Sequence, residues 1–274
     1  MRCYYICIKL PVGENMSNKR LRSSKTIESA KAAELSSVVK SVTEDCVNLQ
    51  NISLMKISEK EEKIAEEIRE QGYYILRTYH DMNEYMQILS GGYKLLFAKT
   101  ELCSYLEDFC KKVAPYTAKK GIAVISTLPE DKILLKTDPE KLCYALANIV
   151  LNSMENSPNG TRIKIILSST SRFAKITVAD RGFGMSEETL EHCTQPLFTK
   201  SERKSKLGLG LTLAGHFASE SGGRLSVKSE EGKGTAVSLS IPLLEITHET
   251  AVGSFTKTDF ENMEYIIKTV FSKN

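Results

Sequence analysis

The sequence predicts an α+β protein, with an antiparallel helical hairpin at residues 26–92 and a two-layer α/β sandwich at residues 93–244. Two observations predict this class. Apolar residues recur on heptad spacing through the first region, and strand-like runs alternate with amphipathic helical runs through the second. A polar, flexible lead-in at residues 1–25 precedes the hairpin, and a tail at residues 245–274 follows the sandwich.

Length and composition exclude several classes of protein. The 274 residues are 26% charged and 41% hydrophobic, a balance typical of globular proteins. A net charge of +3 does not indicate nucleic-acid binding, and no apolar run approaches the ~20 residues that a membrane-spanning helix needs. None of the seven cysteines forms a C-x-x-C pair, so we expect free, buried thiols in a reducing cytoplasm.

The hairpin is predicted from two apolar seams. The first seam consists of Ala32, Leu35, Val39, Val42, Cys46 and Leu49. The second seam consists of Ile64, Ile68, Ile75, Met82 and Leu89. Gly91 and Gly92 are expected to end the second helix. Because two helices cannot bury both their faces alone, we expect two copies to form a four-helix bundle. The alternative is a hairpin that packs only on its own globular domain.

The second domain is predicted element by element. Short apolar runs predict strands at residues 94–98, 122–126, 133–136, 163–168, 173–179, 225–229 and 235–241. An amphipathic helix is expected over residues 102–113, and a second begins at Asp138-Pro139, since Asp favours the N-cap and Pro the first turn. A third helix follows Gly208 and stops at residues 222–223, behind a lid at residues 182–207.

Two motifs of this domain carry polar groups that could contact a nucleotide. Asn148 and Asn152 are four residues apart on a predicted helix, so their amide oxygens could hold a hard cation such as Mg²⁺. Asp180 directly follows a strand and could accept a hydrogen bond from an exocyclic amine such as that of adenine. Gly182 and Gly184 would let the backbone approach a flat ring. The alternatives are solvent-facing asparagines and a plain turn.

Two further motifs are rich in glycine. Gly208-Leu209-Gly210-Leu211 opens a helix, where free backbone N–H groups bind phosphate. Basic residues precede it on a polar stretch that could reach the same phosphates or could simply be solvated: Lys200, Arg203, Lys204 and Lys206. Between two strands, residues 231–235 (EGKGT) form a glycine turn, and Thr235 could place a hydroxyl near the base.

The order and spacing of these motifs resemble the ATPase fold shared by histidine kinases, gyrase, Hsp90 and MutL, and most closely the sensor histidine kinases. TDPEKLCYALANIVLNSMENSP resembles the Asn box of that family, and VADRGFGM its first glycine box. QPLFTK resembles the Phe box, with Phe198 at its centre, and LGLGLTLAGHFASESGG the second glycine box. EEGKGTAVSLSIPL resembles the closing strands, and YILRTYHDMNEYMQILSGGYKL the second bundle helix.

The resemblance implies binding of Mg²⁺ and ATP, with Asn152 as the metal ligand and Asn148 assisting. It implies that Asp180 binds the adenine amine. The rest of the implied pocket consists of Gly182, Gly184, Phe198, Lys200, Gly208, Leu209, Gly210, Leu211 and Thr235. It also implies a homodimer that works with the receiver domain of a response regulator. Gyrase-like ATPases place a Glu where this chain has Asn148, and an amide cannot serve as a general base. We therefore expect transfer to a protein group rather than self-contained ATP hydrolysis.

The first bundle helix departs from the family pattern. There the phosphate acceptor is a His in a motif like H-E-[LI]-[RK]-[TN]-P-[LI], and the best match, AELSSVV, has Ala33 at the His position. Glu34 and Ser37 are the candidate catalytic residues of this degenerate motif, because Ser37 stands where a Thr or Asn positions water. No His precedes His80. Autophosphorylation at the usual position is therefore not expected.

Several functions are consistent with this departure. The chain could phosphorylate a partner or form a heterodimer with an active kinase. It could be a catalytically inactive ATP-binding adaptor, or a response-regulator phosphatase that uses Ser37. His80 could be the acceptor, although its place near the second seam favours a structural role. A hydrolysing ATPase of the gyrase type would need an acidic residue that the sequence lacks.

Two smaller features complete the prediction. Glu155 stands where the family often has a basic residue, and it could weaken ATP binding through repulsion. In the tail, residues 258–261 (TDFE) form a capping-box pattern ahead of an apolar periodicity. This pattern predicts a short amphipathic helix that packs on the chain's own surface, with binding to a partner as the alternative.

Overall fold

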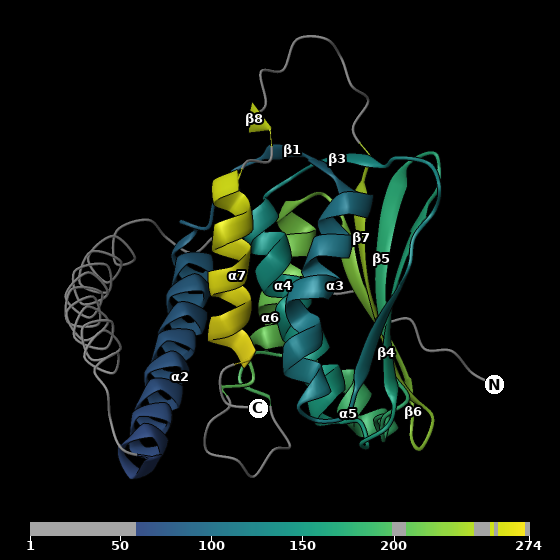
Figure 1. The fold of residues 1–274 in the computed structure, drawn as a ribbon. Helices are drawn as coiled ribbons and strands as arrows, with labels where there is room; N and C mark the ends of the chain where they lie inside the picture. Colours follow the sequence, from purple (N-terminus) through teal and green to yellow (C-terminus); the bar gives the residue numbers. More distant parts are fainter. Residues whose placement is uncertain (1–58, 199–206, 244–252, 255–256, 272–274) are drawn as a thin grey trace, which may run out of the picture. The chain divides into compact units, whose positions relative to one another are not determined.

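The computed structural model describes residues 59–198, 207–243, 253–254 and 257–271. They fall into two compact units (Figure 1): one contains α2 (Glu59–Ser90), and the other contains the elements from Lys94 onwards. The predicted first bundle helix, with Ala33, Glu34 and Ser37, lies outside the described residues. The hairpin as a whole therefore stays a prediction.

The helix α2 covers the predicted second bundle helix without a break. The side chains of its predicted seam are exposed, with exposed fractions between 38% and 62%. Tyr73 and Leu76, at other positions of the helix, are buried. The helix ends where the sequence predicts, because Gly91 takes a φ of +71° and its N–H donates to the carbonyl of Ile88.

The second unit is built on a five-stranded sheet in the order β2-β4-β5-β7-β6. These strands are β2 (Ala123–Thr127), β4 (Arg162–Ser169), β5 (Phe173–Ala179), β6 (Arg224–Glu230) and β7 (Gly234–Pro242). The β2–β4 pair is parallel and the other pairs are antiparallel. Apolar residues of β4 and β5 are buried at alternate positions, as a sheet with one covered face requires.

A smaller three-stranded sheet has the order β3-β1-β8. It consists of β1 (Ala98–Glu101), β3 (Leu134–Thr137) and β8 (Gly253–Ser254), and β8 pairs with β1 in parallel. The prediction of a strand at residues 94–98 was wrong, because the strand only begins at Ala98. Ahead of it, the N–H of Leu96 donates to Oδ2 of Asp138 at 2.8 Å, a side chain rather than a strand partner.

Helices cover one face of the large sheet (Figure 1). They are α3 (Leu102–Ala118), α4 (Pro139–Glu155) and α6 (Gly210–Glu220), with the short α5 (Glu187–His192) near one end. α7 (Lys257–Phe271) packs against α4 and α3. Four of its side chains are buried: Met263, Ile267, Val270 and Phe271.

The helix α4 is fixed at both ends. Asp138 is its N-cap, with Oδ1 accepting from the N–H of Lys141 at 3.0 Å, and Pro139 occupies the first turn as the sequence predicts. At the other end, Nζ of Lys120 donates to the carbonyl of Met154 at 2.8 Å, which satisfies one of the helix's last acceptors. These contacts set the position of the helix that carries Asn148 and Asn152.

Candidate functional site

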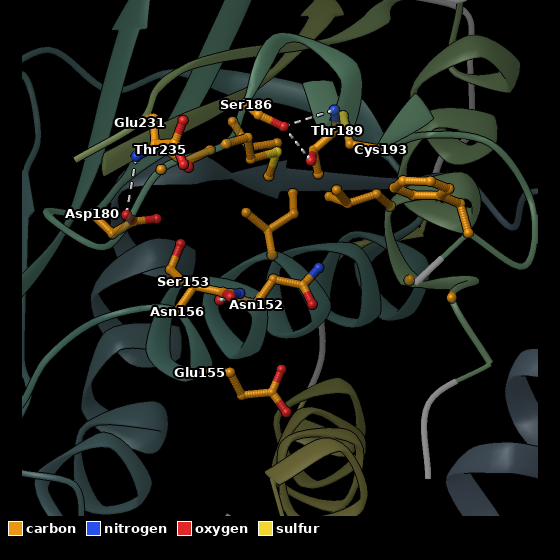
Figure 2. A pocket seen from close by; sticks show the side chains of 18 residues that line it. Asn152, Ser153, Glu155, Asn156, Asp180, Ser186, Thr189, Cys193, Glu231 and Thr235 are labelled. Atoms are coloured by element: carbon orange, nitrogen blue, oxygen red, sulfur yellow. Dashed lines mark hydrogen bonds between the residues drawn. The ribbon is translucent and has the colours of Figure 1, made fainter. Parts of the chain in front are cut away.

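A cavity of about 540 Å³ lies beside α4 in the second unit. Figure 2 shows side chains from α4, α5, the loop after β5 and the strand β7 around it. Its walls include several of the residues singled out in the sequence: Asn152, Asp180, Gly184, Phe198, Gly208, Gly210, Leu211 and Thr235. Segments far apart in the chain thus meet at one place.

Asp180 is held rigidly at the end of β5. Its Oδ1 accepts hydrogen bonds from the N–H groups of Gly182 at 2.9 Å and Thr235 at 3.0 Å. The second oxygen points toward the middle of the cavity (Figure 2), and within the described part of the chain it accepts no hydrogen bond. The carboxylate therefore presents a fixed acceptor to a ligand.

The glycines after Asp180 are required by close approach of neighbouring chain segments. A Cβ on Gly182 would lie 2.1 Å from the carbonyl oxygen of Asn156. A Cβ on Gly184 would lie 2.0 Å from that of Glu230, and its φ of +67° also favours glycine. The N–H of Phe183, which lies between the two glycines, donates to the carbonyl oxygen of Asn156 at 2.9 Å. The loop is thus fastened to the end of α4 on one side and to β6 on the other.

The hydroxyl of Thr235, the residue bonded to Asp180, has a partner of its own on the neighbouring strand. Oγ1 of Thr235 lies 2.8 Å from Oγ of Ser229 on β6, which also lies within hydrogen-bond distance (3.0 Å) of the carbonyl of Gly234. Thr235 lines the cavity as the sequence predicts. Sequence reasoning missed Ser229, because its role depends on the pairing of β6 with β7, where Ser229 lies opposite Thr235.

The two asparagines of α4 have different surroundings. Asn152 lines the cavity. Asn148 is 1% exposed and is not among the lining residues, and its Nδ2 donates to the carbonyl of Tyr144 at 3.1 Å. A Cβ on Gly210 would lie only 3.1 Å from Oδ1 of Asn148. Asn148 therefore packs against the start of α6, and metal binding at either position stays a prediction.

The start of α6 closes one side of the cavity. Gly208, Gly210 and Leu211 line it, and Leu209 is the buried N-cap residue. Leu209 has an apolar side chain that makes no capping hydrogen bond to the N–H groups of the first turn. That arrangement suits an anion such as a phosphate.

Phe198 lies within the predicted lid, residues 182–207, at the end of the part that the structure describes. Its ring lines the cavity and lies 5.7 Å from the ring of His192. A Cβ on Gly208 would lie 2.4 Å from the carbonyl oxygen of Phe198, so the backbones of these two residues approach closely. Leu197 takes a φ of +62° and is 58% exposed. Lys200 and the other predicted basic residues, at 199–206, are not among the described residues.

The helix α5 supplies a wall that sequence reasoning missed. Met185, Ser186, Thr189 and Cys193 line the cavity from this side. The sequence does carry a helix start here, because Ser186 is followed by two glutamates. In the structure Ser186 is the N-cap, and its Oγ accepts from the N–H of Thr189 at 3.3 Å. Burial raises the pKa of the Cys193 thiol to about 11. The four cysteines of the described residues are all free.

Within the described ranges, no three His, Cys, Asp or Glu side chains gather where they could hold a metal ion. The predicted Mg²⁺ site therefore depends on the amide oxygen of Asn152 together with groups that a ligand would bring. In the part of the chain that the structure describes, no helix is long and apolar enough to cross a membrane.

Comparison with known proteins identifies relatives of this chain. Residues 137–245 match the family described as histidine kinase-, DNA gyrase B- and HSP90-like ATPase. Histidine protein kinase DivJ of Caulobacter vibrioides is 26% identical over 191 residues, which cover 69% of this chain and 32% of DivJ. Sporulation kinase D of Bacillus subtilis is 30% identical over 150 residues, covering 53% of this chain and 29% of the kinase. The chain thus spans about a third of the length of these curated relatives.

Solved structures share the fold. Full-length ShkA, crystallised in complex with AMPPNP, superposes with a TM-score of 0.67 at 17% identity. The match covers 81% of this chain and 47% of ShkA. At this level of identity the likeness concerns the fold alone.

Proposed function

We propose that this chain, a homologue of sensor histidine kinases with a histidine kinase-type ATPase domain at residues 137–245, binds ATP with Mg²⁺ and acts in two-component phosphosignalling. One observation carries the proposal. Asp180, Asn152 and the first residues of α6 line a single cavity. A carboxylate oxygen for the base, an amide oxygen for the metal and backbone N–H groups for the phosphates therefore lie within reach of one nucleotide.

The proposed binding mode follows from the fixed groups of the cavity. The second oxygen of Asp180 accepts a hydrogen bond from the exocyclic amine of adenine, with the Thr235 hydroxyl near the base. The N–H groups at the start of α6 face the phosphates. The amide oxygen of Asn152 contributes to a Mg²⁺ ion held mainly by phosphate oxygens and water. ShkA, which shares the fold, was crystallised with AMPPNP.

The acceptor of the phosphoryl group is the finer part of the proposal. With Ala33 in the place of the usual His, and no His before His80, we propose that transfer from ATP goes to a partner protein rather than to the first helix. The partner is a response-regulator receiver domain or an active kinase in a heterodimer. His80 is less suited, because its place near the second seam on α2 favours a structural role.

Dimerisation is proposed through α2. Its seam side chains, including Ile75 and Leu89, are exposed in the single chain. An exposed apolar seam with heptad spacing is buried when a second helical hairpin packs against it. Homodimerisation in a four-helix bundle is therefore the arrangement we expect.

Nucleotide binding is tested by calorimetric titration of the purified chain with ATP and Mg²⁺. Asp180→Asn keeps the oxygen that accepts from Gly182 and Thr235 but replaces the free acceptor by a donor. We expect it to weaken binding at least tenfold. Asp131→Asn, the same change at an exposed carboxylate away from the cavity, is the matched control and should bind as the wild type does. A wild type that binds no ATP would contradict the proposal.

Phosphotransfer is tested with γ-³²P-ATP, alone and with candidate receiver domains. Transfer means that the γ-phosphoryl bond to ADP breaks and a bond to the acceptor side chain forms. Label that depends on Asn152, compared through Asn152→Ala and the exposed control Asn159→Ala, would support the kinase. ATP binding with no label on any protein would favour the second candidate, an adaptor or phosphatase that uses Ser37. Loss of label from a phosphorylated receiver would then identify the phosphatase.

A further inference from the structure

The helix α4, which carries Asn152, is enclosed on the side away from the sheet by α7. The two helices pack against each other, and Sγ of Cys143 lies 3.9 Å from the carbonyl of Met263. Ala147, Val150 and Met154 follow Cys143 at intervals of four, seven and eleven residues, which places them on the same side of α4. All three are completely buried. The residues matched by the ATPase family end at 245, so α7 lies beyond them.

The helix α7 is held by contacts that are independent of α4. Nζ of Lys112 on α3 pairs with Glu264 at 3.1 Å, and the rings of Tyr116 and Phe271 lie 5.6 Å apart. Ahead of α7, β8 pairs with β1, so the segment is also attached to the small sheet. The helix α7 is thus attached to α3, the preceding strand β8 is paired with β1, and α7 packs against α4.

From these contacts we infer that α7 positions the metal side of the nucleotide site by holding α4, with the buried Met263 and Ile267 acting as positioning residues for Asn152. The inference rests on the proposed nucleotide binding. The cavity has two walls of different construction. Asp180, directly after β5, and Thr235 on β7 are joined by two hydrogen bonds: the N–H of Asp180 donates to the carbonyl of Thr235, and the N–H of Thr235 donates to Oδ1 of Asp180. Asn152 stands on α4, whose outer side is covered by α7. Loosening α7 therefore acts first on α4 and Asn152, while Asp180 keeps its hydrogen bonds to Thr235 of β7.

The consequence is a separable effect on binding. The base is held by the sheet wall in the presence or absence of metal, whereas the gain from Mg²⁺ depends on the α4 wall. The quantity to measure is the factor by which Mg²⁺ tightens ATP binding, taken as the ratio of the Kd in EDTA to the Kd in Mg²⁺. A change that merely unfolds part of the molecules would scale both constants together.

The experiment compares variants of the full chain by calorimetric titration. Ile267→Ala removes a side chain that is 1% exposed, and Ile267→Val removes one methylene for use if the first variant is poorly folded. Tyr265→Ala, at an exposed position of the same helix, is the control. We expect Ile267→Ala to reduce the Mg²⁺ factor at least threefold while the Kd in EDTA changes less than twofold. Ile267→Val should reduce the Mg²⁺ factor by less, and Tyr265→Ala should change neither the Mg²⁺ factor nor the Kd in EDTA. Parallel weakening in both conditions, or an unchanged Mg²⁺ factor, overturns the inference.

Hydrogen exchange without nucleotide separates this inference from the proposed function. Ile267→Ala should speed exchange in peptides of α4, residues 142–154, and leave β5, residues 173–179, as in the wild type. If the wild type binds no ATP, the proposed function fails, and exchange alone then decides whether α7 holds α4. Unchanged exchange in α4 overturns the positioning role whatever the nucleotide result.

Discussion

The helices α4 and α2 are both rich in apolar residues, but only one of them finds a complete cover among the described residues. α4 is buried on nearly all sides, between the sheet and α7. α2 keeps the side chains of its heptad seam exposed, with Leu89 at 62%. A helix that is apolar all round belongs inside one folded unit, whereas a narrow seam on a charged helix belongs to an assembly. The pattern of α4 is thus satisfied within its own unit, whereas the pattern of α2 is the one that we propose for a helical bundle.

The largest expected effect is a loss of stability when a buried side chain of α7 is truncated. Phe271→Ala removes a ring that is 2% exposed and packs beside Tyr116, so we expect the free energy of unfolding to fall by about 3–5 kcal/mol. Urea denaturation followed by circular dichroism measures it. Tyr265→Ala, at a position that is 53% exposed, should cost no more than about 0.5 kcal/mol. Equal losses for the two variants would mean that Phe271 does not anchor α7 in the core.

The start of α4 is expected to contribute less. Asp138 accepts from the N–H groups of Lys141 and Leu96, and it is 3% exposed. Asp138→Ala leaves both donors without this acceptor, at a cost of about 1–3 kcal/mol. Asp138→Asn can still cap the helix, but its amide group either meets the N–H of Leu96 with a donor or loses that bond. Its free energy of unfolding should therefore lie between those of Asp138→Ala and the wild type. Both are read from the same urea curves, and an Asn variant as unstable as Ala would argue against a separate role for the Leu96 bond.

The outer partner of α2 is tested at its seam. Leu89→Glu places a charge in the proposed dimer interface and should weaken self-association about tenfold or more, which corresponds to about 1.4 kcal/mol. The stability of the ATP-binding unit should not change. Ser90→Glu, at the neighbouring exposed position, adds the same charge outside the seam and is the control. Sedimentation equilibrium gives the dimer constant, and equal weakening by both variants would place the interface elsewhere.

The smallest expected effect concerns thiol reactivity. Burial raises the pKa of Cys143 on α4 far above its ordinary value and that of Cys193 to about 11. Because the thiolate is the nucleophile, only about 0.1% of Cys193 is reactive at pH 8, and its labelling rate should rise about tenfold per pH unit up to pH 10. Mass spectrometry after iodoacetamide treatment locates the label. Cys143 should stay unlabelled in the folded chain, and rapid labelling there would show that the α7 side of α4 is open.

Much of the ATP-binding unit follows from local sequence. Asp138-Pro139 begins α4 and Gly91 ends α2, because capping depends on a few neighbouring residues. The apolar alternation of residues 163–168 and 173–179 gives β4 and β5. The residues that the motifs singled out at Asn152, Asp180, Gly208, Gly210 and Thr235 all line one cavity. Their order along the chain was enough to identify the fold.

Other parts depended on segments that are distant in sequence. Residues 94–97 do not form the predicted strand, because the N–H of Leu96 donates to Oδ2 of Asp138, 42 residues away, rather than to a neighbouring strand. Gly182 and Gly184 are needed where the loop crosses the carbonyl groups of Asn156 and Glu230, rather than only beside a bound ring. The α5 wall with Cys193 carried a helix signal but no sign that it faced the nucleotide site.

The sequence by itself determined the class of fold, the ends of the main helices and most of the residues around the cavity. Only the tertiary structure decided which of two identical side chains faces that cavity. Asn148 and Asn152 share one face of α4 by helical spacing, yet Asn148 is covered where Gly210 approaches it and Asn152 is not. The physical reason is range: helical periodicity is set within a few residues, whereas the approach of α6 and the cover of α7 depend on packing between segments that are far apart in the chain.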